Sequence, residues 1–299
     1  SFDGAETAQT NKDASGLGTF FYAVPSGFKA LCTKNVTIES STVYNAKKHF
    51  NCVTWTGDTN GSKDITGVGF TPDLVSIKSR TNTYEFLWFD SVRGAAKRLF
   101  SHNDNNESVN LATLNGFITD GFRLGTGSSV DLSVSGSASN NYVAWCWKAG
   151  GAAVTNNNGS VTSQVSANKD AGFSIVTYSG SNDSTVTFGH GLDSAPELVF
   201  IKRRNNANGW RVYTHSLGLG KYLSLSSDSA PTTSSQDFAS VSSTTFGVKG
   251  GYNPVSINGG TYVAYCWHSV PGYSKFGSYV GTGAQPGTIL DLGFKPAMI

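Results

Sequence analysis

Charge is scarce in this sequence, and so are methionine, proline and cysteine. Charged residues make up 14% of the 299 residues, against about 25% in an average soluble domain, and the net charge is only +2. A chain with so little net charge has no extended positive potential to attract a polyanion, which argues against nucleic acid as a partner. Because no run of about 18 apolar residues occurs, membrane insertion is not expected either.

The four cysteines carry no sign of metal or disulfide chemistry. None stands in the Cys-x-x-Cys spacing of a zinc site, so neither a metal nor any other cofactor is expected. Cys146 and Cys266 each precede a tryptophan in similar surroundings, which predicts small buried side chains. Free thiols fit a protein that folds in a reducing cytoplasm.

What the sequence does contain is a duplication, most visible in one hexapeptide. Tyr-Val-Ala-Trp-Cys-Trp at 142–147 returns at 262–267 as Tyr-Val-Ala-Tyr-Cys-Trp. Since side chains alternate along a strand, both faces of this segment are apolar, which is typical of a central strand covered on both sides. The residues predicted to form this structural core are Trp145, Cys146, Trp147, Tyr265, Cys266 and Trp267.

Further landmarks recur in the same order. A strand begins with proline at Pro72 and again 124 residues later at Pro196, and the same offset carries Trp88 onto Val212. The predicted organisation is a preceding module at 1–44, repeats at 45–150 and 173–272, a linker at 151–172, and the start of a truncated third repeat at 273–299.

Short strand patterns follow one another every 8 to 12 residues or so, separated by Gly, Asn, Ser and Asp clusters. This spacing predicts an all-β fold made of tandem antiparallel β-sandwich repeats, jelly-roll-like in form. The best candidate for a short helix is 91–100.

Two recurring polar positions flank the proline-initiated strand. Asp73 and Glu197 follow the proline, so an acid recurs at the same position of both repeats. We expect such an acid to belong to a turn or a sheet edge rather than to a catalytic site. Lys78 recurs as Lys202 at the other end of the strand. A solvated strand edge is the simplest interpretation of these lysines, with an anion site as the alternative.

One string carries a family resemblance: Pro-Ser-Gly-Phe-Lys-Ala-Leu-Cys-Thr-Lys-Asn at 25–35. It resembles the C-terminal end of the SPRY-like, concanavalin-type modules of large tailed-phage virion proteins. The repeats that follow, with Pro-Asp-Leu-Val-Ser-Ile-Lys at 72–78, look like the β-rich domain that accompanies such modules. The resemblance implies a virion structural protein without established catalytic residues.

No catalytic constellation stands out. The five histidines occupy unmatched positions of the two copies, and the nucleophile-elbow pattern Gly-x-Ser-x-Gly is not met by the candidate serine loops. For binding, Trp88, Trp210 and Tyr213 are candidates for stacking on sugar rings, and their alternative role is to fill the core of the repeats.

The expected function is therefore non-enzymatic: a virion structural protein, tail- or fibre-associated, that contacts other virion proteins and takes part in host attachment. The alternative is a lectin-like adhesion module that recognises a host surface glycan, either in the virion or in an extracellular protein. A homo-oligomer is expected, a trimer by analogy. No nucleic acid is expected as a partner.

Overall fold

The structure is a computed structural model that describes residues 10–20, 22–28, 30, 43–58, 62–125, 140–285 and 287–299. The chain divides into two compact units, Ser1–Ser41 and Thr42–Ile299. Both predicted repeats lie in the second unit. Cys32, together with the rest of the phage-like string from residue 31 onward, lies outside the described residues.

The first unit is organised around one carboxylate. Asp13 accepts the backbone N–H groups of Ser15 and Leu17 at 2.9 Å and of Ala30 at 2.8 Å. A single antiparallel bridge joins Asn11 to Phe20. These bonds define a small turn-rich structure in the described part of this unit.

Among the described residues of the second unit, the regular secondary structure is all strand apart from one 3-10 turn, Ala46–Lys48. The described residues of the first repeat form nine strands: β1 (Phe50–Thr56), β2 (Lys63–Ile65), β3 (Leu74–Ser79), β4 (Leu87–Asp90), β5 (Lys97–Phe100), β6 (Ser108–Val109), β7 (Leu114–Ile118), β8 (Gly121–Leu124) and β9 (Asn141–Trp147). The prediction of an all-β fold with antiparallel sheets is confirmed.

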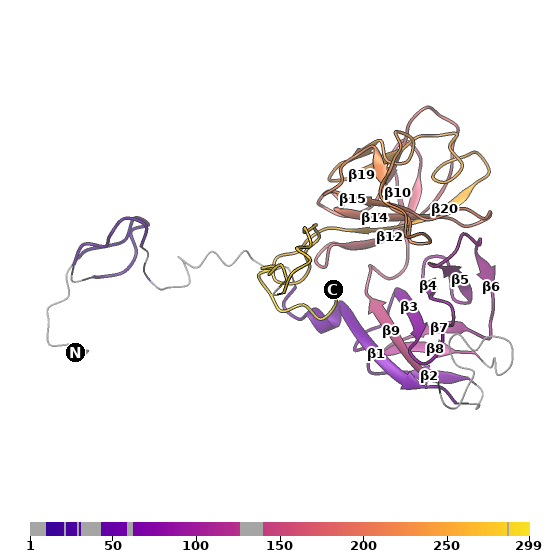
Figure 1. The fold of residues 1–299 in the computed structure, drawn as a ribbon, viewed down its shortest axis with the longest axis horizontal. Helices are drawn as coiled ribbons and strands as arrows, with labels where there is room; N and C mark the ends of the chain where they lie inside the picture. Colours follow the sequence, from indigo (N-terminus) through magenta and orange to yellow (C-terminus); the bar gives the residue numbers. More distant parts are fainter. Residues whose placement is uncertain are drawn as a thin grey trace. The chain divides into compact units, whose positions relative to one another are not determined.

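Eleven further strands follow in the described chain: β10 (Val154–Asn156), β11 (Ser163–Asn168), β12 (Phe173–Ser179), β13 (Val186–Gly189), β14 (Leu198–Arg203), β15 (Arg211–Thr214), β16 (Lys221–Tyr222), β17 (Thr232–Thr233), β18 (Ser240–Val241), β19 (Thr245–Val248) and β20 (Thr261–Trp267). Figure 1 shows that the strands from β10 onward gather beside those of the first repeat.

Strand pairing reproduces the duplication residue by residue. Val75 lies opposite Cys146 between β3 and β9, and Val199 lies opposite Cys266 between β14 and β20. The outer pairs repeat as well, because β1 runs along β9 in the register in which β12 runs along β20. The strands β1 to β9 therefore correspond, in order, to β12 to β20.

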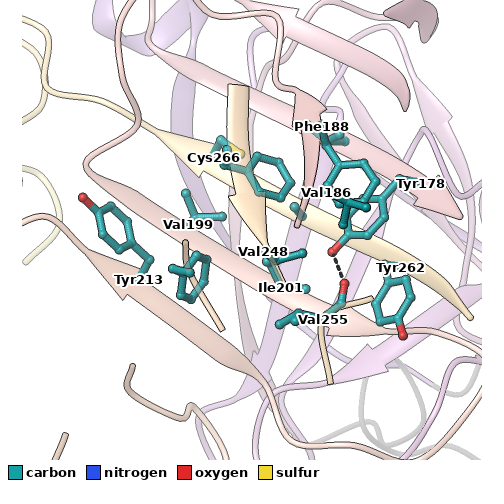
Figure 2. Packing of buried hydrophobic residues seen from close by; sticks show 14 of the residues in the cluster. Tyr178, Val186, Phe188, Val199, Ile201, Tyr213, Val248, Val255, Tyr262 and Cys266 are labelled. Atoms are coloured by element: carbon teal, nitrogen blue, oxygen red, sulfur yellow. Dashed lines mark hydrogen bonds between the residues drawn. The ribbon is translucent and has the colours of Figure 1, made fainter. Parts of the chain in front are cut away.

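Each repeat is a sandwich of one large and one small sheet. In the first repeat the large sheet has the order β1-β9-β3-β4-β5-β6 and the small one β2-β8-β7. In the second repeat the large sheet runs β10-β11-β12-β20-β14-β15 and the small one β13-β19-β18, while β16 and β17 form a separate two-stranded sheet. Figure 2 shows the core of the second repeat, where the Tyr178 hydroxyl donates to the Val255 carbonyl at 2.8 Å.

The two faces of the duplicated hexapeptide serve different cores. Ala264 and Cys266 belong to the core within the second repeat, whereas Val263, Tyr265 and Trp267 belong to a third cluster. That third cluster also contains Leu74, Trp88 and Leu99 of the first repeat. The large sheets of the two repeats thus pack against each other, which explains why neither face of the hexapeptide is polar.

Most of the predicted core residues are buried. Cys146, Tyr265, Cys266 and Trp267 are buried, while Trp145 and Trp147 in β9 are half-buried. Of the four cysteines, the described three, Cys52, Cys146 and Cys266, are free thiols.

Two sequence predictions need correction. The predicted linker 151–172 contributes β10 and β11, which extend the large sheet of the second repeat beyond β12. The best candidate for a short helix, 91–100, is a turn followed by β5, in which Leu99 and Phe100 alternate across the sheet and enter different cores.

The segment 273–299, predicted to begin a third repeat, contains no strand among its described residues. Tyr279 and Val280 within this segment are exposed. Tyr273 at its start packs against a small cluster of Val43, Ala171 and Val270.

Candidate binding groove between the repeats

The structure buries the three aromatics considered for sugar stacking. Trp88, Trp210 and Tyr213 are 6%, 0% and 7% exposed. Trp88 lies 5.6 Å from Trp210 between ring centroids, and the Trp210 indole N–H donates to the Phe100 carbonyl at 2.7 Å. Of their two predicted roles, the structure supports the core, because a buried ring offers no face to a sugar.

The recurring lysines are structural rather than a solvated strand edge. The Lys78 ammonium donates to the Tyr84 carbonyl, and the Lys202 ammonium donates to the Asn208 carbonyl, six residues on in both copies. Lys202 is fully buried, and burial lowers its pKa to about 8, with Asp104 opposing that shift. The expectation of a solvated edge is therefore wrong for Lys202.

The recurring acids close the end of each large sheet. Asp73 accepts the N–H of Ala149 at 2.8 Å, and Glu197 accepts the hydroxyl of Ser269 at 2.6 Å. Both contacts hold the segment that follows the central strand, β9 or β20, as expected for a turn feature.

A buried polar network joins the two repeats. The Asp90 carboxylate accepts the Tyr265 hydroxyl at 2.6 Å and the Arg93 guanidinium at 2.5 Å. Arg93 also donates to Glu107 at 3.0 Å, and Arg204 of the second repeat donates to both oxygens of Glu107 at 2.9 and 3.0 Å. Tyr265 and Arg204 thus reach across the contact to carboxylates of the first repeat.

The charged groups in this network stabilise one another in their ionised forms. Burial alone would lower the pKa of Arg93, but the charges of Asp90 and Glu107 beside it raise that pKa instead. Burial would raise the pKa of Glu107, yet hydrogen bonds and charge from Arg204 and Arg93 hold it below its usual range. Both groups are therefore ionised at neutral pH.

An open groove of about 740 Å³ lies at the same junction. Its lining comes from both repeats and is mostly polar: His102, Asn103, Asp104, Ala207, Asn208, Gly209, Arg211, Tyr222, Ser224, Ser226, Ser227, Ser229, Ala230 and Thr232. We refer to these residues as the junction groove. Its volume falls in the range of about 300–1,000 Å³ that is typical of small-molecule sites.

The groove forms where two equivalent loops converge. The loop 101–107 follows β5, which pairs with β6, and the loop 223–231 follows β16, which pairs with β17 in the matching register. The Ser226 hydroxyl of the second loop donates to the Asp104 carboxylate of the first at 2.7 Å. Neither repeat alone provides both walls.

Arg211 lines the groove and is held by two neighbouring side chains. Its Nε donates to Asp237 at 2.8 Å, and its guanidinium carbon lies 4.4 Å above the centre of the Tyr222 ring. Asp237 is fully buried, and burial raises its pKa despite the arginine beside it. The guanidinium is consequently fixed in orientation before any ligand arrives.

The sequence did not single out this groove. The signal available was the 124-residue offset, which maps His102 onto Ser226 and Asp104 onto Asp228. That offset relates the two loops as equivalents but does not indicate that they face each other. Among the histidines, only His102 lines the groove.

Within the described ranges, no three His, Cys, Asp or Glu side chains cluster as metal ligands. The same ranges hold no helix of the length and apolarity needed to cross a membrane.

The fold defines an all-β protein of two fused antiparallel sandwich repeats with a polar groove at their junction. Residues 45–299 match the family described as Domain of unknown function (DUF7483), and the chain belongs to that family. The match covers both repeats as one family domain. No curated protein matches the chain, and no solved structure does.

Proposed function

We propose that this chain is a non-enzymatic structural protein of a tailed-phage virion, tail- or fibre-associated, that works through contacts with other virion proteins. The observation that carries the proposal is the fusion of the two repeats through a shared aromatic core and a buried ion network. Such a fusion suits a rigid spacer, since it removes the freedom of two domains joined by a linker.

Two sequence features support the virion assignment. The string at 25–35 resembles the end of a phage SPRY-like module, and the surface is polar but weakly charged. Assembly in the virion as a homo-oligomer, a trimer by analogy, belongs to the same proposal. An extracellular adhesin is the alternative setting.

Host attachment through a carbohydrate is the second candidate function. The buried rings of Trp88, Trp210 and Tyr213 do not support it. The junction groove does, because it is polar, open to solvent and built from loops that the fold holds in place.

Fractionation of intact particles tests the structural proposal. Particles from the source culture are banded on a density gradient and probed with an antibody raised against the purified chain. We expect the full-length protein to co-sediment with particles and gold label to locate it on the tail. If the protein remains in the soluble fraction while known virion proteins band, the structural role is excluded.

A further inference from the structure

The chemistry of the junction groove selects for hydroxyl groups. Amides of Asn103 and Asn208 and the hydroxyls of four serines and one threonine line it, whereas alanine and one tyrosine ring are its main apolar contributions. Amides and hydroxyls both donate and accept hydrogen bonds, as the hydroxyls of a sugar do. The lining offers little apolar surface against which a lipid or an apolar peptide could be buried.

The charges that face the groove are nearly balanced. Asp104 brings one negative charge, and Arg211 brings one positive charge that Asp237 already partners. A polyanion such as a nucleic acid needs an excess of positive charge, which this lining does not provide. The ligand that fits is therefore polyhydroxylated and uncharged.

The base of the groove places an acceptor and a donor side by side. At Gly209, a side-chain carbon would lie 3.2 Å from both the Asp104 Oδ1 and the Arg211 Nη1. The absence of a side chain at Gly209 lets these two polar groups lie close to its backbone, an acceptor near a donor, where neighbouring hydroxyls of one ligand could contact both. At the 124-residue offset the first repeat has Glu85 and Leu87 in place of Gly209 and Arg211, so the arrangement is particular to the second repeat.

From these observations we propose that the junction groove binds a neutral saccharide, with Asp104 accepting and Arg211 donating hydrogen bonds to neighbouring hydroxyls. Tyr222 holds the guanidinium from below as a positioning residue. The inference rests on the attachment role given above as the second candidate function. It requires both repeats, because Asp104 and Arg211 lie on different ones.

Binding is tested with the purified full chain on an array of neutral and acidic bacterial surface polysaccharides. Hits are then measured by calorimetry with the released oligosaccharide. We expect binding to neutral glycans that stays unchanged when the NaCl concentration is raised fivefold, because no net charge is neutralised. Binding restricted to acidic glycans and lost in salt would overturn the proposal, and so would an array without hits at high valency.

Variants locate the site. Asp104→Asn and Gly209→Val are each expected to weaken binding about tenfold or more, which corresponds to roughly 1.4 kcal/mol. Asp193→Asn, an exposed carboxylate outside the groove that pairs with Lys169, is the matched control and should bind like the wild type. Wild-type affinity in both groove variants would show that the saccharide binds elsewhere.

Thermal melting separates loss of binding from loss of fold. Ser226→Ala, which removes one hydroxyl that bonds to Asp104, serves as a milder variant if Gly209→Val melts early. The particle fractionation described above is independent of all these variants. A protein that bands with particles but binds no glycan would keep the structural proposal and reject this one.

Discussion

A single hydroxyl accounts for the one difference between the two hexapeptides. Tyr265 stands where the first repeat has Trp145, and its hydroxyl donates to Asp90 across the inter-repeat contact. Trp145 in β9 packs against Phe86 in the same repeat, where no such bond is needed. The tyrosine thus links the second repeat to the first, although the two hexapeptides are otherwise identical.

Breaking the buried ion network should be costly. The Arg93–Asp90 pair is fully buried, so Arg93→Met leaves an uncompensated carboxylate inside the protein. We expect the free energy of unfolding to fall by about 3–5 kcal/mol, measured by urea denaturation. Arg123→Met, which breaks an exposed pair with Asp64, is the control and should leave the midpoint nearly unchanged. Equal effects of the two variants would contradict the assignment.

His190 should make stability depend on pH. Its ring accepts the N–H of Leu192 at 3.1 Å and lies 3.1 Å from the Ser242 carbonyl, and burial lowers its pKa to about 4. The unfolded chain, with a histidine pKa near 6.5, binds the proton more readily than the folded protein does. Stability is therefore full above about pH 6.5 and falls by about 3 kcal/mol as the pH drops to about 4.

Urea unfolding of the wild type and of His190→Gln between neutral and acidic pH checks this prediction. In the variant, the free energy of unfolding should lack the part of its pH dependence that comes from His190. It should retain the acid sensitivity that comes from carboxylates such as Glu107. Parallel pH profiles for the two proteins would mean that His190 titrates normally.

At the scale of elements, the two repeats differ at the outer edge of one equivalent strand, which is β1 in the first repeat and β12 in the second. β12 lies between β20 and β11, whereas β1 pairs with β9 alone among the described strands. Cys52 and Thr54 on β1 are exposed, while nearly all of β12 is buried, with Ile175 packed in the cluster shared by the two repeats. The residues between the repeats supply the strands that cover β12, so they belong to the second sandwich.

Hydrogen exchange should report this difference. In β12 every amide lies between two strands, so we expect slow exchange along its length. In β1 every second amide points away from β9 and should exchange faster. Residue-resolved exchange by NMR measures both strands in one sample. Uniform protection along β1 would show that another segment pairs with its outer edge.

At the scale of the whole molecule, the two repeats of Thr42–Ile299 form one compact unit. Trp88 of the first repeat lies in ring contact with Phe200, Trp210 and Tyr265 of the second. Separation would expose these rings together with the Asp90 and Glu107 carboxylates. The shared contact therefore makes each repeat depend on the other.

This dependence predicts a single unfolding transition for both repeats. Tryptophan fluorescence and far-UV circular dichroism should give coincident urea curves. Trp88→Ala should lower the free energy of unfolding by about 3–5 kcal/mol and shift both curves together. Leu219→Ala, at a half-exposed side chain, is the control with little effect. Two separate transitions would show that the repeats unfold independently.

The sequence by itself determined the duplication, the β class and the two apolar faces of the hexapeptide. These follow from local periodicity and from matched spacing, such as Pro72 with Pro196, and neither requires knowledge of contacts. The same patterns did not separate a strand from a linker at 151–172, since Ser, Asn and Gly also occur in edge strands beside turns.

Only the tertiary structure decided what the second apolar face meets. That Trp88 and Trp210 lie in an inter-repeat core, and that Asp104 lies near Arg211 in a groove, depends on residues more than 100 positions apart in the chain. Strand alternation fixes which side of a sheet a residue occupies. The packing of one sheet on another fixes what lies opposite, and only that packing assembles the groove.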